Sequence, residues 1–241
     1  NMRFVPVKSV EQQAVLSLHR VRQSFVKART AQANQIRSLL GEFGLVMPKG
    51  ITNVRKRVPE VLENATDQLP ASFQHLVARL LDHLKELDRQ VGQLEAQIKA
   101  WHRSSELSQK LEKIPGIGPL GASALVASIA DARSFANGRQ VSAWIGLVPR
   151  QHSSGGKPTL LGISKRGDVY LRTLLIHGAR SAIVAAQRRA AVNPWLAGLL
   201  HRRNPNVAAV ALANKNARTV WALLAHDREF RRDYVPTLAA V

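Results

Sequence analysis

Residues 73–101 read FQHLVARLLDHLKELDRQVGQLEAQIKAW and hold the clearest periodic pattern of the chain. Apolar side chains recur there in alternating steps of four and three residues, at Phe73, Val77, Leu80, Leu84, Leu87, Val91, Leu94, Ile98 and Trp101. Four heptads of this spacing predict a helix with a coiled-coil seam. The seam needs a partner, which is either an antiparallel helix of the same chain or a helix of another subunit. We expect a hairpin within the chain combined with dimerisation.

Residues 9–43 are the candidate partner helix within the chain. Ser9 fits an N-cap, and Gln12 follows it at the spacing of a capping box. Apolar side chains then recur at helical spacing, at Ala14, Leu18, Val21, Phe25, Ala28, Ile36, Leu39 and Phe43. Gly44 and Pro48 end the pattern. A shorter helix is predicted over 53–66, where Pro59 demands a kink or a break.

Pro115 marks a change of composition. Beyond it, Ala, Gly and Arg dominate short helices, predicted at 119–130, 139–146, 167–190, 194–202 and 206–226. Residues 149–165 are predicted to form a loop, and strand signals are confined to 3–7 and 158–163. The predicted fold class is therefore mainly α, with a long antiparallel coiled-coil hairpin followed by a compact helical domain. The predicted domain ranges are 1–8, 9–110 and 111–241.

The balance of charge points to a polyanionic partner. The 241 residues include 35 Lys and Arg against 16 Asp and Glu, which gives a net charge of +19. Nucleic acid is the first candidate for such a chain. A membrane surface is the alternative, but no segment combines a large apolar face with Trp and Phe anchors. No stretch reaches 18 apolar residues and no signal-peptide layout is present, so we expect a cytoplasmic protein without a membrane partner.

The composition also argues against a bound metal ion. The chain has no cysteine, which excludes disulfides and thiolate zinc sites, and its eight histidines show no metal-ligand spacing. Between Asp131 and Asp227 the only acidic residue is Asp168, which fits the N-cap of the helix that follows it. That region offers hydroxyls, amides and cations but no clustered carboxylates. No metal ligand is predicted in this chain.

Residues 114–120, IPGIGPL, precede a helix of small residues. This arrangement matches the hairpin of a helix-hairpin-helix module, in which Gly116 and Gly118 let backbone N–H groups approach a DNA phosphate. The positive end of the following helix would add to the attraction. A tight Pro-Gly turn between two packed helices is the alternative interpretation.

Residues 152–172, HSSGGKPTLLGISKRGDVYLR, contain the parts of a phosphate-binding site. Gly155 and Gly156 permit close backbone approach, and Lys157 supplies charge. Either Ser153 or Ser154 could attack a DNA phosphodiester and form a phosphoserine, which conserves the bond energy for strand exchange. Cations that could stabilise the pentacovalent transition state are Arg150, Lys165, Arg166 and Arg172. A flexible Ser-Gly loop without catalytic function is the alternative.

Two further patterns involve polar residues on predicted helices. Lys215 and Arg218 share one side of the helix over 206–226 and could contact a nucleic-acid backbone, or could simply be a solvated face. The spacing of His177 and Arg180, with Tyr234 beyond, is also found in tyrosine recombinases. An amphipathic helix with an exposed polar face explains that pair more simply.

Several of these segments together resemble one known family. They are MRFVPVKSVEQQAVLSLHRVR, IPGIGPLGASALVASI, WIGLVPRQHSSGGKPTLLGISKRGDVYLRTLLIHGARSAI and VALANKNARTVWALL. The family is the "one-ten" insertion-sequence transposases, and the chain looks like its "eleven-eleven" subgroup. These proteins join an N-terminal RuvC-like DEDD domain to a C-terminal, serine-bearing transposase domain. The resemblance spans essentially the whole chain.

The resemblance implies a DNA recombinase guided by a bridge RNA and acting as a dimer or tetramer, with the coiled coil as an assembly element. It places the nucleophile on Ser154, with Ser153 and Ser164 as alternatives. It also implies that the four acidic residues of the RuvC-like domain, which would bind Mg²⁺, lie upstream of Asn1, with residues 1–8 as the last edge of that domain. We therefore expect the chain alone to be inactive.

Two interpretations from other functional classes remain open. One is a non-catalytic module that binds nucleic acid and oligomerises, and the other is a structural coiled-coil protein whose charge only aids solubility. Nucleic-acid binding that weakens steeply with salt, without strand cleavage, would indicate the former.

Overall fold

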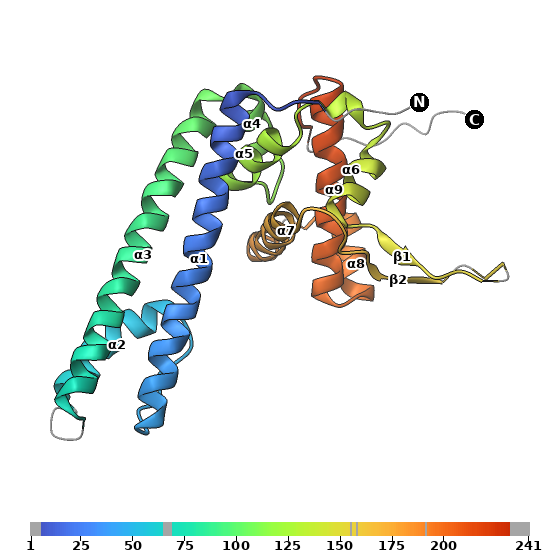
Figure 1. Ribbon diagram of the computed structural model, residues 1–241. Helices are drawn as coiled ribbons and strands as arrows, with labels where there is room; N and C mark the ends of the chain where they lie inside the picture. Colours follow the sequence, from blue (N-terminus) through green and yellow to red (C-terminus); the bar gives the residue numbers. More distant parts are fainter. Residues whose placement is uncertain (1–5, 65–68, 155, 158, 191, 232–241) are drawn as a thin grey trace, which may run out of the picture. The chain divides into compact units, whose positions relative to one another are not determined.

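The computed structural model describes residues 6–64, 69–154, 156–157, 159–190 and 192–231. The chain is mainly helical, as predicted, and its described elements follow in the order shown in Figure 1. The elements are α1 Val10–Glu42, α2 Ile51–Asn64, α3 Ala71–Ser104, α4 Glu106–Glu112, α5 Pro119–Ser128, the 3₁₀ helix η1 Ala132–Ser134, α6 Gly138–Ile145, β1 Pro149–Gln151, β2 Leu160–Ile163, α7 Val169–Arg188, α8 Pro194–Arg202 and α9 Pro205–Ala225.

The chain divides into two compact units, residues 17–97 and residues 1–16 with 98–241. The predicted domain ranges 1–8, 9–110 and 111–241 stay a prediction. The strand expected at 3–7 falls largely outside the described residues, and residues 6 and 7 are not in a strand. Among the described helices, none is both long enough and apolar enough to cross a membrane.

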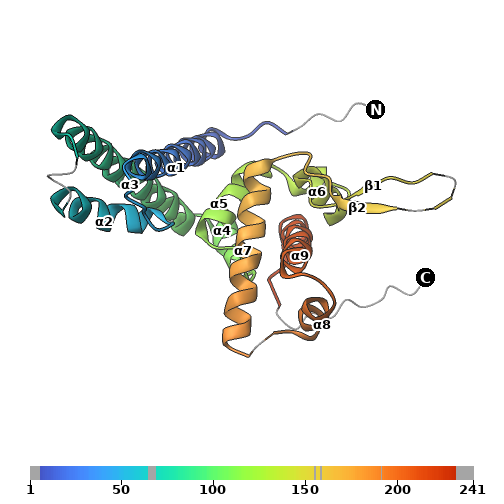
Figure 2. The ribbon, with the colours of Figure 1, turned by 90° about the horizontal axis from the view of Figure 1, so that it is seen from below.

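In the unit of residues 17–97, α1 and α3 form an antiparallel hairpin within the chain. Side-chain pairs fix the direction, because partners on α3 move backwards as positions on α1 advance. Arg22 pairs with Glu95, Arg29 with Asp88, and Gln32 with His83. Figures 1 and 2 show the two helices side by side along their length. The predicted hairpin is therefore present, whereas dimerisation stays a prediction.

The predicted seam on α3 is largely buried in this unit. Val77 and Leu84 are fully buried and pack against α1 and α2, together with Val54 and Val58 of α2. Pro59 lies inside α2, which continues beyond it, so the helix does not break there, and a kink stays a prediction. Asp88 accepts from both Arg29 of α1 and Arg55 of α2, and thus ties all three helices together.

The predicted apolar face of α1 is wrong in part. Val21 and Phe43 are 43% and 44% exposed, and the buried positions near them are Val15, His19 and Leu40. Arg22 and Arg29 are turned toward α3, so the inner face of α1 is partly polar. Periodicity of apolar residues alone could not detect a seam completed by ion pairs. Burial, with a contribution from Arg22, lowers the pKa of His19 to about 4.

In the other unit, α9 lies at the centre of a helical core and packs against α6, α7 and α8 (Figure 2). Its small buried residues, including Ala208, Ala213 and Ala217, allow this close approach. The predicted helices 119–130, 139–146, 167–190, 194–202 and 206–226 are confirmed as α5 to α9 with ends shifted by at most two residues. The pattern did not predict α4 as a separate helix; Ser105 caps it by accepting from Ser108 N–H.

Candidate functional site

The segment predicted as a loop over 149–165 contains a β-hairpin instead. β1 and β2 pair antiparallel, with Gln151 opposite Leu160 and an irregularity between Pro149 and Gln151. The strand signal at 158–163 is confirmed for Leu160–Ile163. In both views the strand pair extends away from α6 and α9 of its own unit (Figures 1 and 2). Both strands are mostly exposed, so little burial marks them as strands in the sequence.

Ser154 and Lys157 face each other at the tip of this hairpin. They form an antiparallel bridge, in which the Lys157 N–H donates to the Ser154 carbonyl oxygen at 3.1 Å. Gly156, between them, has a φ of 78°, the left-handed conformation that turns of this kind demand. Gly155 lies outside the described residues. Gly156, predicted to help cradle a phosphate, thus belongs to the turn that sets Ser154 opposite Lys157.

The alternation of side chains along a strand separates the two candidate serines. His152 N–H donates to Thr159 O at 2.9 Å, so the pairs 152–159 and 154–157 lie in one register. Directly opposite residues share a face, and neighbours along a strand point to opposite faces. One face therefore carries His152, Ser154, Lys157 and Thr159, and the other carries Gln151, Ser153 and Leu160.

Ser153 is engaged by a neighbour on its own face. The Gln151 side-chain amide donates to Ser153 Oγ at 3.0 Å, which agrees with the alternation. Ser154 is exposed at the turn, beside a cation. Ser164 lies at the other end of the hairpin, where its N–H donates to Val148 O, and is only partly exposed. Of the three serines, Ser154 has the access and the cationic neighbour that a nucleophile for a phosphodiester needs.

Lys165 and Arg166 lie at the base of the hairpin and not at its tip. Lys165 has a φ of 56° and donates its N–H to Gly146 O. Both residues are exposed. They come after Ile163, which is six residues or about 20 Å of strand from Lys157. In this structure they are therefore not adjacent to Ser154, but they could contact a nucleic acid that runs along the hairpin. Arg150 is exposed on β1, between the base and the tip.

Arg172 does not present its charge to solvent. It is 8% exposed, and its Nη1 donates to Ile145 O at 2.8 Å. That carbonyl belongs to the last turn of α6, where a cation is favoured by the helix dipole. The expected phosphate contact thus gives way to a structural role, in which Arg172 joins α7 to the end of α6 beneath the hairpin.

The turn at Gly116 packs against α7. A Cβ built on Gly116 would lie 2.7 Å from Gly178 O, and one built on Gly178 would lie 1.8 Å from Gly116 O. Asn216 of α9 also donates to Pro115 O. This packing supports the tight-turn interpretation for Gly116. Gly118 is exposed and is the N-cap residue of α5, so its backbone remains accessible to a phosphate.

The remaining sequence candidates lie on helices. Lys215 and Arg218 are exposed on α9, and Lys215 Nζ lies 4.5 Å from the centre of the Trp195 ring. His177 and Arg180 are exposed on α7, which supports a solvated face. Tyr234 lies outside the described residues. α9 thus carries exposed cations in the same unit as the serine hairpin.

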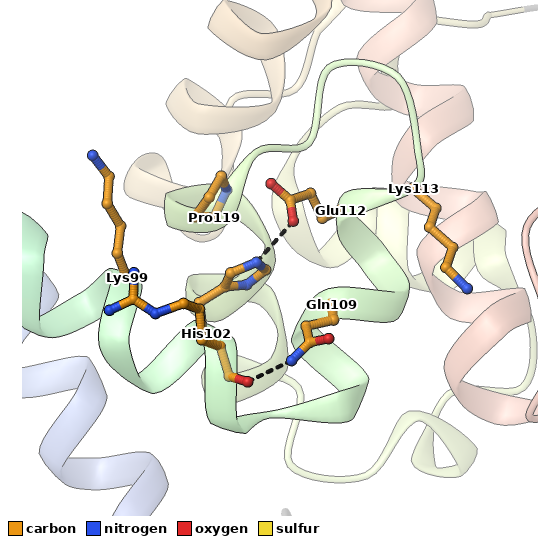
Figure 3. Close-up of a pocket in the computed structure, with 7 residues that line it drawn as sticks. Lys99, His102, Gln109, Glu112, Lys113 and Pro119 are labelled. Atoms are coloured by element: carbon orange, nitrogen blue, oxygen red, sulfur yellow. Dashed lines mark hydrogen bonds and ion pairs between the residues drawn. The ribbon is translucent and has the colours of Figure 1, made fainter.

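A cavity of about 770 Å³ lies among α3, α4 and α5 and was not anticipated from sequence. Its lining residues are Lys99, His102, Arg103, Gln109, Glu112, Lys113 and Pro119. Figure 3 shows the His102 ring directed at Glu112, at 2.9 Å, and its other nitrogen lies 2.7 Å from Ser108 Oγ. Ser108 is completely buried, so its hydroxyl cannot reach a substrate. The Ser-His-Glu chain therefore joins α3 to α4 structurally.

The described residues include no group of three or more His, Cys, Asp or Glu side chains that could hold a metal ion. The functional groups near the tip of the hairpin are the Ser154 hydroxyl, the His152 imidazole, the Lys157 amine and backbone amides.

Comparisons with known proteins agree with one another. Residues 108–193 match the model of the family described as "Transposase IS116/IS110/IS902 family". The "Probable family 20 transposase" of Pseudomonas aeruginosa is 52% identical over 96% of this chain and 69% of its own length. The transposase for insertion sequence element IS1111A of Coxiella burnetii is 45% identical over 96% of the chain. The transposase for insertion sequence element IS1328 of Yersinia enterocolitica is 40% identical over the same share.

The chain spans only part of these relatives. It covers 64% of the Coxiella protein and 69% of the Yersinia protein. The matched family segment contains the Gly116 turn, the serine hairpin and the whole of α7.

Proposed function

The chain belongs to the IS116/IS110/IS902 family of insertion-sequence transposases, and from this premise we propose that it cuts and rejoins DNA through a phosphoserine on Ser154. One observation carries the assignment: Ser154 is exposed at a hairpin tip, directly opposite Lys157. Directly opposite residues have Cβ atoms about 5 Å apart, so the ammonium group can reach a phosphate that the hydroxyl attacks.

The reaction consists of two transfers at phosphorus. Ser154 Oγ attacks the phosphodiester, the Oγ–P bond forms, and one P–O bond to the DNA strand breaks. The leaving oxygen takes up a proton and departs as a hydroxyl, while the serine proton passes to solvent. A hydroxyl of the incoming strand then attacks the phosphoserine and releases Ser154. The number of phosphoester bonds is unchanged, so no high-energy cofactor is consumed.

Charge on the hairpin supports DNA as the substrate. Residues 149–163 include Arg150 and Lys157 but no acidic residue. Lys165 and Arg166 at the base, with Lys215 and Arg218 on α9, extend the cationic surface of the same unit. We propose that these exposed cations hold the phosphate backbone and that Lys157 alone contacts the reacting phosphate among them.

A bridge RNA and a homo-oligomeric assembly complete the proposal. The net charge of +19 supports binding of a second nucleic acid beside DNA. A coiled-coil hairpin with exposed Val21, Phe43 and Leu76 supports subunit contacts along it.

The test traps the covalent intermediate. The transposase is incubated with element-end DNA that carries a nick beside the scissile phosphate, and this nick prevents rejoining. The covalent adduct is detected by a gel shift that survives denaturation. Ser154→Ala should abolish the adduct and keep DNA affinity, whereas Ser153→Ala and Ser164→Ala should form it. An adduct at wild-type yield with the Ser154→Ala protein would disprove the assignment of Ser154 as the nucleophile.

A non-catalytic nucleic-acid-binding module is the second candidate, because the exposed cations would serve it equally well. The same experiment separates the two. Salt-dependent binding without any adduct, in wild type and variants alike, would favour the module.

A further inference from the structure

We propose that His152 is the proton-transfer residue of this active site and donates its proton to the oxygen that leaves the phosphorus. The inference rests on the proposed function of Ser154 and adds a second catalytic residue to it. Sequence reasoning did not select His152, because residues two positions apart in a loop have no defined relationship. The β-hairpin supplies that relationship.

The register places His152 on the same face as Ser154 and Lys157. His152 N–H donates to Thr159 O at 2.9 Å, and Lys157 N–H donates to Ser154 O at 3.1 Å. Positions 152 and 154 are thus successive residues on one face, about 6.6 Å apart along the strand. Ser153, between them, points to the opposite face and pairs with Gln151.

This separation suits an in-line displacement at phosphorus. The attacking and leaving oxygens lie on opposite sides of the phosphorus, roughly in line. With Ser154 as the attacking group, the leaving oxygen is displaced by several ångströms, within the reach of an imidazole two residues away. Lys157 lies opposite Ser154 and contacts the non-bridging oxygens. The three side chains therefore match the three positions at which charge or protons change.

The proton balance follows from these roles. As the Oγ–P bond forms and the P–O bond breaks, protonated His152 gives its proton to the leaving oxygen, which departs as a hydroxyl. The Ser154 proton passes to water. In the rejoining step the neutral imidazole takes the proton of the incoming hydroxyl, and Ser154 Oγ leaves phosphorus with a proton from water, which restores both residues to their starting state.

The surroundings of His152 leave its ring available. It is exposed, and no hydrogen bond from its ring to another described residue is present. The charged groups on the hairpin are Arg150 and Lys157, with no carboxylate between residues 149 and 163. No described helix packs along the tip, so the groups that face the ring are those of the hairpin itself (Figure 2). The His102 imidazole, in contrast, is held by Ser108 and Glu112.

A sulfur substitution in the DNA tests the role. A thiolate leaves phosphorus without needing a proton, so a bridging phosphorothiolate at the scissile position bypasses a general acid. In the transposase, His152→Ala should slow adduct formation 10²- to 10⁴-fold on normal DNA. On phosphorothiolate DNA the same variant should react within a few-fold of wild type. Gln151→Ala, on the opposite face, is the matched control and should match wild type on both substrates.

The outcomes separate the failure of this inference from that of the proposed function. If His152→Ala is equally slow on both substrates, or is not slow on normal DNA, His152 is not the acid, while the role assigned to Ser154 stands. If Ser154→Ala forms the adduct on either substrate, the proposed function itself fails. Rescue by sulfur also shows that the His152→Ala protein is folded and binds DNA.

Discussion

Ser154 and Lys157 are directly opposite each other across the turn that ends the β-hairpin, and a backbone hydrogen bond of 3.1 Å closes the turn between them. Backbone pairing therefore sets these two exposed residues opposite each other. Because Gly156 takes a φ of 78°, a residue with a side chain at that position would strain the turn. The pairing of Ser154 with Lys157 therefore identifies the candidate site more specifically than the large number of cations in the chain does.

Lys157→Ala should lower the rate of adduct formation by about 10²-fold at saturating DNA, since a cation next to the reacting phosphate stabilises the transition state. Lys165→Ala removes the same charge at the base of the hairpin and is the matched control. It should weaken DNA binding at moderate salt and leave the saturated rate unchanged. Rapid-quench measurement of the covalent adduct distinguishes them, and equal effects on the saturated rate would contradict the assignment.

Arg166→Ala should change DNA binding, whereas Arg172→Met should change the stability of the fold. Arg166 is exposed, so its loss should reduce the slope of log affinity against log salt by about 1 and leave the melting temperature unchanged. Arg172 is buried and donates to Ile145 O, so its loss should cost about 2 kcal/mol of unfolding free energy. Urea unfolding and salt titrations of DNA binding provide the two readouts. A stable Arg172→Met protein with a changed salt slope would restore the phosphate role.

Gly178→Ala should destabilise the fold although alanine favours helices. Its Cβ would lie 1.8 Å from Gly116 O, and the backbone must move, at a cost of about 1–3 kcal/mol. Gly198→Ala in α8 is the control, because a Cβ there meets nothing within 4 Å. That variant should be neutral or more stable by up to about 1 kcal/mol. Thermal unfolding of both proteins gives the comparison, and equal stability would disprove the close crossing.

Acidification should weaken the helical hairpin through His19. Burial lowers the pKa of His19 to about 4 from 6.5, so the unfolded chain takes up the proton first as the pH falls. The contribution to stability is complete above pH 6.5 and is lost as the pH falls toward 4. At pH 4.5 the loss should be about 2–3 kcal/mol.

His19→Gln is the variant that isolates this effect, because glutamine does not titrate. Urea unfolding of both proteins between pH 7.5 and 4.5 should show that the difference in unfolding free energy changes with pH. A constant difference over that range would mean that His19 does not stay neutral in the fold.

Much of the helical architecture was predictable because it depends on local patterns. The heptads of residues 73–101 selected a long helix with one buried face, and Val77, Leu84 and Val91 are buried as that pattern requires. Asp168 accepts from Leu171 N–H as the N-cap of α7, a contact within three residues. The inner face of α1 was not predictable, since its Arg22 and Arg29 become partly buried only when Glu95 and Asp88 are brought opposite them.

The sequence by itself determined the excess of cations, the absence of thiol ligands and the small set of serines from which the proposed nucleophile is drawn. Only the tertiary structure decided which residues act together. Strand pairing sets Ser154 against Lys157 and aligns His152 with them, while the packing of α7 against α6 withdraws Arg172 into the core. Both results depend on which residues lie opposite one another in space. The order of residues along the chain does not reveal this, because it is set only when the strands pair and the helices pack.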